Sequence, residues 1–202
     1  MSAVSDRIMK RVRGQGRGWV FTPRHFIDFG TRASVDMALS RLARSGDIRR
    51  IGRGLYDYPV QHDKLGSLTP DPERVAQALS RQSGEKLAAS GAAAANRLGL
   101  SNQVPTRMSF ATSGRSRTKK AAGRSFALKH SRAPVLPNAP DSVNAVVQAL
   151  AHLGRANVDA DKIRRFASQI GDRDFQLLEK ARPEMPGWMG DVILKIGRAR
   201  NG

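Results

Sequence analysis

Residues 31–58, which read TRASVDMALSRLARSGDIRRIGRGLYDY, decide how the first part of the chain folds. Four apolar residues recur there at the i, i+3, i+4, i+7 spacing of an amphipathic helix: Val35, Ala38, Leu39 and Leu42. Thr31 suits the cap at the start of this helix, and Gly46 suits its end. Two short strand-like runs follow at residues 47–51 and 55–58. The glycine-rich residues 52–54 between them predict a β-hairpin.

The residues before this stretch predict another short helix that ends in a tight turn. Thr22 and Pro23 are typical of an N-cap and a first helical position, and Gly30 ends the pattern. Two short helices joined by a glycine-containing turn are typical of a helix-turn-helix. A hairpin directly after the second helix is a wing. With a helix at residues 4–12 and a strand at 19–21, the sequence predicts a winged helix-turn-helix over residues 1–62.

The side of the second helix opposite its apolar stripe carries arginines and small residues. The first residues of a recognition helix approach base edges, and arginines contact guanines or phosphates. An arginine at the hairpin tip is placed to enter the minor groove or to hold a phosphate. The alternative is an ordinary amphipathic helix with a solvated basic face. The residues expected to contact DNA are Arg32, Ser34, Arg41, Arg44, Arg49, Arg50 and Arg53.

The charge of the whole chain favours a polyanionic partner. Lys and Arg number 35 against 17 Asp and Glu, which gives a net charge of +18. Such a charge attracts nucleic acid, but composition alone does not separate DNA from RNA or from an acidic membrane. Cysteine is absent, which excludes disulfides and thiolate metal sites. No apolar run reaches the length of a signal peptide or a membrane span, so a cytoplasmic protein without a membrane partner is expected.

Residues 63–202 predict a second domain in two parts. The first, up to about residue 133, combines helices at 72–82 and 87–98 with strands at 106–112 and 125–130. Its basic loop carries a second patch for nucleic acid or another partner, and the alternative is a solvated loop. This patch comprises Arg115, Arg117, Lys119, Lys120 and Arg124.

After about residue 141 the apolar spacing predicts a bundle of four helices, at residues 142–153, 161–170, 172–181 and 188–199. The fold class expected for the whole chain is therefore α+β and mostly helical. It comprises the winged helix-turn-helix, a mixed α/β element and the helical bundle.

The sequence offers no recognisable set of catalytic residues. The four histidines lie far apart, without metal-ligand spacing, and no phosphate-binding loop, dinucleotide fingerprint or nucleophile elbow occurs. We therefore expect a protein that is not an enzyme and that has neither cofactor nor metal.

Two stretches resemble the AbiEi-type antitoxins of type IV toxin–antitoxin (abortive infection) systems. They are residues 35–59, VDMALSRLARSGDIRRIGRGLYDYP, and residues 95–107, ANRLGLSNQVPTR, and the resemblance extends over about residues 5–132. It implies a transcriptional repressor that binds the operator upstream of its own gene through its winged helix. It also implies that the rest of the chain counters a nucleotidyltransferase-like toxin without a stable complex.

Two other functions remain open from the sequence. One is a stand-alone winged-helix transcription factor, and the other is a basic protein associated with RNA or the ribosome. The small number of aromatic residues argues against stacking on single-stranded RNA.

Overall fold

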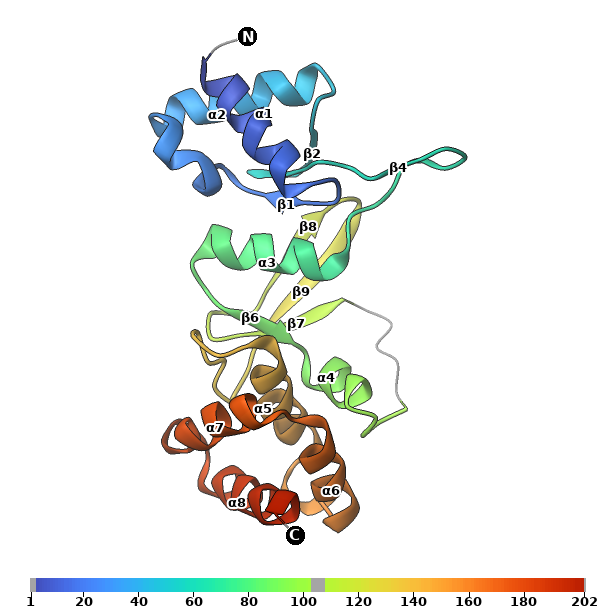
Figure 1. The fold of residues 1–202 in the computed structure, drawn as a ribbon, viewed down its shortest axis with the longest axis vertical. Helices are drawn as coiled ribbons and strands as arrows, with labels where there is room; N and C mark the ends of the chain where they lie inside the picture. Colours follow the sequence, from blue (N-terminus) through green and yellow to red (C-terminus); the bar gives the residue numbers. More distant parts are fainter. Residues whose placement is uncertain (1–2, 103–107, 202) are drawn as a thin grey trace. The chain divides into compact units, whose positions relative to one another are not determined.

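The computed structural model describes residues 3–102 and 108–201 and shows an α+β, mostly helical chain (Figure 1). The chain forms two compact units. Unit 1 comprises residues 1–84 and 119–126, and unit 2 comprises residues 85–118 and 127–202. This division differs from the boundary expected after residue 62, because two later segments pack into unit 1. Within the described ranges, no helix is both long enough and apolar enough to cross a membrane.

Unit 1 begins with three helices and a small sheet. The helices are α1 (Ala3–Gln15), the 3-10 helix η1 (Pro23–Phe29) and α2 (Arg32–Arg44). The strands β1 (Val20–Phe21), β2 (Arg49–Gly52) and β3 (Leu55–Asp57) form an antiparallel sheet in the order β1-β3-β2. The elements therefore follow the order that the sequence predicts, except that the helix expected after Thr22 is a 3-10 helix.

The apolar stripe of α2 lies in the core of unit 1. Val35, Ala38 and Leu39 are 0% exposed, and they pack in one cluster with residues of α1, β1 and η1 such as Ile8 and Phe21. The burial of this stripe fixes the rotation of α2 about its own axis. Its polar side consequently faces away from the core.

Three further segments belong to unit 1. After β3 the chain forms a short hairpin of β4 (Gln61–His62) and β5 (Gly66–Ser67), and α3 (Pro72–Ser83) then packs on β1. Residues 119–126 form the third segment, and the backbone N–H of Ala122 donates to the carbonyl oxygen of Ile51 at 2.7 Å. This last contact joins segments about 70 residues apart.

The four-stranded sheet, whose last two strands along the chain are divided between the two units, corrects two expectations. Its strands are β6 (Leu87–Ala89), β7 (Ser109–Thr112), β8 (Arg117–Ala121) and β9 (Arg124–His130), in the order β6-β7-β9-β8. The helix expected at 87–98 was wrong in its first part: residues 87–89 pair with β7, and α4 (Gly91–Arg97) begins after the N-cap Ser90. The loop expected before residue 125 contains the strand β8. Residues 103–107, part of the second stretch quoted above and the beginning of the expected strand, lie outside the described residues.

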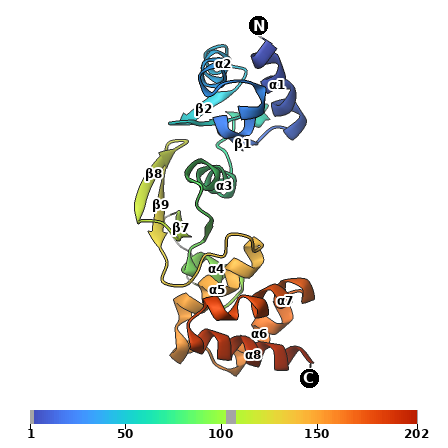
Figure 2. The same cartoon turned by 90° about the vertical axis from the view of Figure 1, so that its left-hand side faces the viewer.

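The helices predicted near the end of the chain share the core of unit 2 (Figure 2). They are α5 (Asp141–Leu153), α6 (Ala160–Gln169), α7 (Asp172–Lys180) and α8 (Gly187–Asn201), with short 3-10 turns at Arg155–Asn157 and Arg182–Glu184. Phe166, Leu178 and Ile193 are at most 1% exposed within this core. The apolar periodicity of the sequence thus located all four helices.

Candidate nucleic-acid interface

The outer side of α2 carries exposed arginines. Arg32, Arg41 and Arg44 are all exposed. The Nε atom of Arg32 donates to both carboxylate oxygens of Asp36, at 3.1 and 2.9 Å, and more than half of the Arg32 side chain is exposed. Ser34 has a different role, because its Oγ donates to the Thr31 carbonyl at 2.8 Å and its N–H bonds to the Thr31 hydroxyl. Ser34 therefore contributes to the N-terminal cap of α2.

The two arginines of β2 have different surroundings. Arg49 donates to Asp57 through Nε at 3.0 Å and through Nη2 at 2.6 Å, and Nη2 also donates to the Leu68 carbonyl at 2.7 Å. Asp57 is 0% exposed, and its hydrogen bond raises the pKa of Arg49 above the ordinary value. Arg50, in contrast, is exposed. Of the two arginines, only Arg50 is directed to solvent without a carboxylate partner in the described part of the chain.

The turn between β2 and β3 is held from α3. The Nε2 atom of Gln82 donates to the carbonyl oxygen of Arg53 at 2.7 Å, and Gly54 has a φ of 64°, which favours glycine. The Arg53 side chain is exposed. The turn is thus fixed by its backbone, while its arginine is left accessible.

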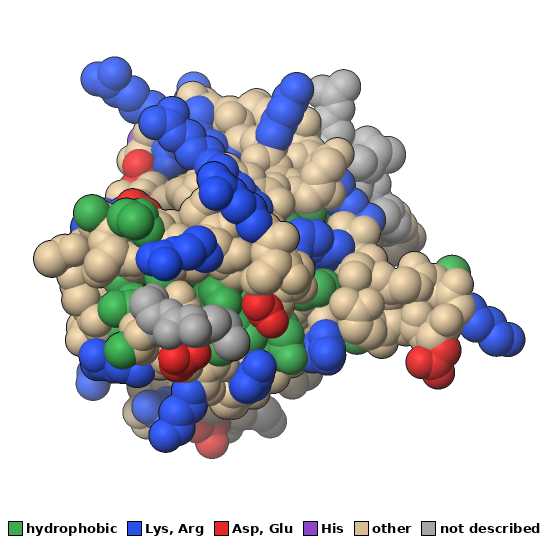
Figure 3. Space-filling model, turned by 90° about the horizontal axis from the view of Figure 1, so that it is seen from above, with side chains coloured by type: hydrophobic (Ala, Val, Ile, Leu, Met, Phe, Trp, Pro, Cys, Tyr) green, Lys and Arg blue, Asp and Glu red, His purple; other side chains and the backbone are tan. Residues whose placement is uncertain are grey.

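The pKa of Tyr56 responds to charges on both α2 and the β2–β3 hairpin. Burial raises the pKa of the Tyr56 phenol, Arg50 and Arg32 oppose this rise, and Asp36 adds to it. Charges alter a pKa strongly only from nearby. Arg32 on the helix and Arg50 on the strand therefore both act electrostatically on one phenol group. Figure 3 shows Lys and Arg side chains spread over the face that it displays, with a smaller number of acidic side chains between them.

The second basic patch is divided between the two units. Lys119 and Lys120 at the end of β8 and Arg124 at the start of β9 are exposed. Residues 119–126, which include these three cations and the turn between the strands and which we call the β8–β9 turn, belong to unit 1. The turn contacts β2 closely: a Cβ atom on Gly52 would lie 3.2 Å from the Lys120 carbonyl oxygen. Three cations that are distant in the sequence therefore adjoin the β2–β3 hairpin. We call the combined set the unit 1 basic face; it comprises Arg32, Arg41, Arg44, Arg50, Arg53, Lys119, Lys120 and Arg124.

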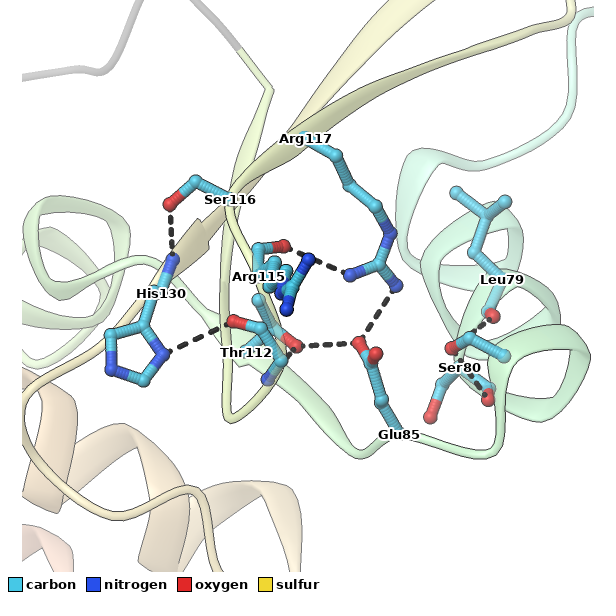
Figure 4. Close-up of polar contacts among 10 residues, drawn as sticks. Leu79, Ser80, Glu85, Thr112, Arg115, Ser116, Arg117 and His130 are labelled. Atoms are coloured by element: carbon cyan, nitrogen blue, oxygen red, sulfur yellow. Dashed lines mark hydrogen bonds and ion pairs between the residues drawn. The ribbon is translucent and has the colours of Figure 1, made fainter.

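The other two patch residues belong to unit 2. Arg117 donates through Nη2 to Oε2 of Glu85 at 2.7 Å, and the Thr112 hydroxyl donates to the same oxygen at 2.9 Å (Figure 4). The hydrogen bond from Arg117 lowers the pKa of Glu85. Arg115 is exposed, and its carbonyl oxygen accepts from Arg117 at 3.0 Å. Arg117 therefore has a structural partner, and its charge is compensated within unit 2.

Residues 7–176 match the model of a family described as "Family of unknown function (DUF6088)". The chain belongs to the DUF6088 family. No curated protein matches it. The matched part contains every residue of the unit 1 basic face, so this face lies within the portion that defines DUF6088 membership.

This DUF6088 chain shows no arrangement of side chains typical of a metal centre in the ranges 3–102 and 108–201, where no three His, Asp or Glu residues are grouped as ligands. His25, His62 and His130 have local hydrogen-bond partners instead. His25 Nδ1, for example, accepts from the Thr22 N–H at 3.1 Å and so helps to cap η1. The feature of unit 1 that is best suited to binding a ligand is therefore its positive charge.

Proposed function

We propose that unit 1 of this protein is a winged helix-turn-helix that binds double-stranded DNA through the unit 1 basic face. In this proposal α2 is the recognition helix and enters the major groove, while the β2–β3 turn is the wing. The proposal rests on one observation above all. The apolar residues of α2 are buried in the core of unit 1, which leaves the arginines of its other side exposed, and the β2–β3 hairpin that follows exposes Arg50 and Arg53.

The outer side of α2 has side chains suited to a groove. Ala33 is small and exposed and permits close approach, and Met37 is 60% exposed and offers an apolar contact of the kind that thymine methyl groups accept. In this proposal Arg41, which is exposed, would form a bidentate contact with guanine. Arg50, Arg53 and the lysines of the β8–β9 turn would bind phosphates, which position a protein on the duplex. Arg49 is left out of this interface because it is bound to Asp57.

The wider role that we propose is that of a cytoplasmic, sequence-specific repressor that acts as the antitoxin of a type IV toxin–antitoxin system. The resemblance of residues 35–59 and 95–107 to AbiEi-type antitoxins supports this role. The DNA partner would be the operator upstream of the protein's own gene. The toxin would be a nucleotidyltransferase-like enzyme, countered without a stable complex, and the antitoxin itself would have no catalytic activity.

The DNA-binding proposal is tested by comparing ligands with the full chain. Fluorescence anisotropy would measure the affinity for a duplex from the region upstream of the gene, for a random DNA duplex and for an RNA duplex of equal length. We expect the upstream duplex to bind about a hundredfold more tightly than random DNA at about 0.15 M salt. Equal affinity for RNA and DNA duplexes would overturn the proposal in favour of a general RNA-associated protein.

The antitoxin role has a separate test. Co-expression of the full chain with the product of the neighbouring gene should restore growth that this product alone arrests. The antitoxin role would be contradicted if growth stayed arrested or if the neighbouring product proved harmless. The protein would then be a DNA-binding regulator only.

A further inference from the structure

Unit 1 contains a cavity of about 520 Å³ that does not belong to the unit 1 basic face. Residues of α1, β1, η1 and α3 line it, and no residue of α2, β2 or β3 takes part. Four of the ten lining residues are arginines and none is acidic: Arg11, Arg24, Arg74 and Arg81. Because Arg11 is paired with Asp28 outside the lining, the positive charge of this hollow comes mainly from Arg24, Arg74 and Arg81.

Two of the four arginines, Arg11 and Arg24, are held in the wall of this cavity by contacts within unit 1. Arg24 donates through Nη1 to the carbonyl oxygen of Arg81 at 3.1 Å and so connects η1 with α3. Arg11 forms two hydrogen bonds to Asp28, at 2.9 and 2.7 Å, and its guanidinium lies 4.0 Å from the centre of the Phe29 ring. Fixed guanidinium groups lose little conformational entropy when they bind an anion.

The remaining lining residues suit an organic ligand with a flat group. Trp19 lies edge-on to His25, with ring centroids 5.2 Å apart and an interplanar angle of 87°. Gln15 and Gln77 supply amide groups that both donate and accept hydrogen bonds. The positive field also acts on His25, because Arg81 and Arg11 add to the effect of burial in lowering its pKa. The lining contains no negatively charged group, so it is suited to a ligand that is an anion.

We propose that this cavity binds a small molecule that carries one or more phosphate groups. Planar guanidinium groups match phosphate oxygens in pairs. The volume lies in the range of small-molecule pockets and leaves room for an organic part beside Trp19. A phosphate of the DNA backbone has the same chemistry, but the cavity contains no residue of the recognition helix or the wing. The site is therefore assigned to a free small molecule, and it is independent of DNA binding.

Isothermal titration of the full chain with inorganic pyrophosphate at constant ionic strength tests the site. We expect saturable binding with a Kd below about 1 mM. The variant Arg74→Ala/Arg81→Ala should weaken this binding by about tenfold or more. The control Arg13→Ala/Lys64→Ala removes the same charge from exposed positions outside the cavity, and its affinity should stay within about twofold. No saturation, or an equal loss in the control, would overturn the proposal.

A second measurement needs no variant. The chain has two tryptophans, so its NMR spectrum has two indole N–H signals. Pyrophosphate should shift the Trp19 signal and leave that of Trp188 in unit 2 in place. Shifts of both signals, or of neither, would contradict a site beside Trp19.

A titration with random duplex DNA distinguishes the two sources of phosphate. The Arg74→Ala/Arg81→Ala variant should keep its DNA affinity within about twofold. Two results together would overturn the proposal: weaker DNA binding by this variant, with a slope of log K against log salt concentration reduced by about two, and no pyrophosphate binding by the parent chain. The cavity would then be a contact for the DNA backbone. Because pyrophosphate is titrated without DNA, failure of the DNA-binding proposal leaves this test intact.

Discussion

Arg49 and Arg50 are neighbours on β2, yet their side chains have opposite surroundings. Successive residues of a strand point to opposite faces, so one arginine reaches the buried Asp57 and the other reaches solvent. The sequence alone placed both in the DNA interface. The position of Asp57 opposite Arg49 in the hairpin is the signal that could have distinguished the structural arginine from the exposed one. This position depends on the strand register, which is irregular between Arg50 and Gly52.

Substitution of each arginine should therefore affect a different property. Arg49→Ala leaves Asp57 buried without its cation, and we expect the free energy of unfolding to fall by about 2–3 kcal/mol, since the guanidinium is itself about a third exposed. Arg50→Ala should change it by less than about 0.5 kcal/mol and should weaken DNA binding instead. Urea unfolding and fluorescence anisotropy measure the two effects. A stable Arg49→Ala chain that no longer binds DNA would reverse the assignment.

Asp36 is the acidic residue that holds Arg32 in the free chain. Both side chains are about half exposed, so the pair contributes little to stability. Asp36→Asn removes a negative charge from the proposed interface and releases Arg32 for phosphate or base. We expect duplex DNA to bind about twofold to fivefold more tightly, with an unchanged midpoint of thermal unfolding. Weaker binding by this variant would show that Asp36 itself accepts a hydrogen bond from DNA.

The 3-10 helix η1 has a capping arrangement that involves a histidine. The spacing from Thr22 to Gly30 predicted a helix, but it gave no reason to expect that His25 Nδ1 would accept from the Thr22 N–H. Burial lowers the pKa of His25, with smaller contributions of the same sign from Arg81 and Arg11. The folded chain therefore takes up a proton on His25 at lower pH than the unfolded chain does.

This linkage predicts a loss of stability in acid that originates at His25. As the pH falls below about 6.5, the unfolded state is protonated first, so the free energy of unfolding decreases until the pH reaches the lower, folded-state pKa. His25→Gln removes this contribution. Unfolding free energies at about pH 7.5 and 5.5 should differ less in the variant than in the parent chain. An equal or larger pH dependence in the variant would contradict this linkage to His25.

The strand β8 shows where a local pattern was not sufficient. Its sequence, RTKKA, has no alternation of apolar and polar residues, and a loop was predicted. The strand exists because it pairs with β9, and the turn between the two strands is held by Ile51. Neither contact can be read from the spacing of nearby residues.

The turn should contribute to DNA binding through its charge. Lys119→Ala/Lys120→Ala should lower the slope of log K against log salt concentration by up to about two, with similar losses on specific and random duplexes. The control is Arg173→Ala/Lys195→Ala, which removes two exposed charges from α7 and α8 in unit 2. An unchanged slope in the lysine variant would remove the turn from the interface.

The organisation of the whole chain was only partly accessible from the sequence. Helices α5 to α8 were located from their apolar periodicity, and α2 was located from its stripe and its cap, because these signals lie within one element. The limits of unit 1 were not accessible, since α3 and residues 119–126 join it through contacts with β1 and Ile51. Three of the five residues of the second basic patch therefore belong to unit 1, among residues that are distant from them in the sequence.

The net charge of +18 makes some attraction to DNA inevitable, so a decisive measurement must separate charge from position. Such a measurement is the affinity of the full chain for the upstream duplex in two variants of equal charge. Arg41→Ala/Arg44→Ala changes the outer side of α2, and Arg173→Ala/Lys195→Ala changes unit 2. We predict that the first variant loses about 2–4 kcal/mol of binding free energy and most of its preference over random DNA, while the second loses less than about 0.5 kcal/mol. Equal losses in the two variants would contradict a recognition surface on α2.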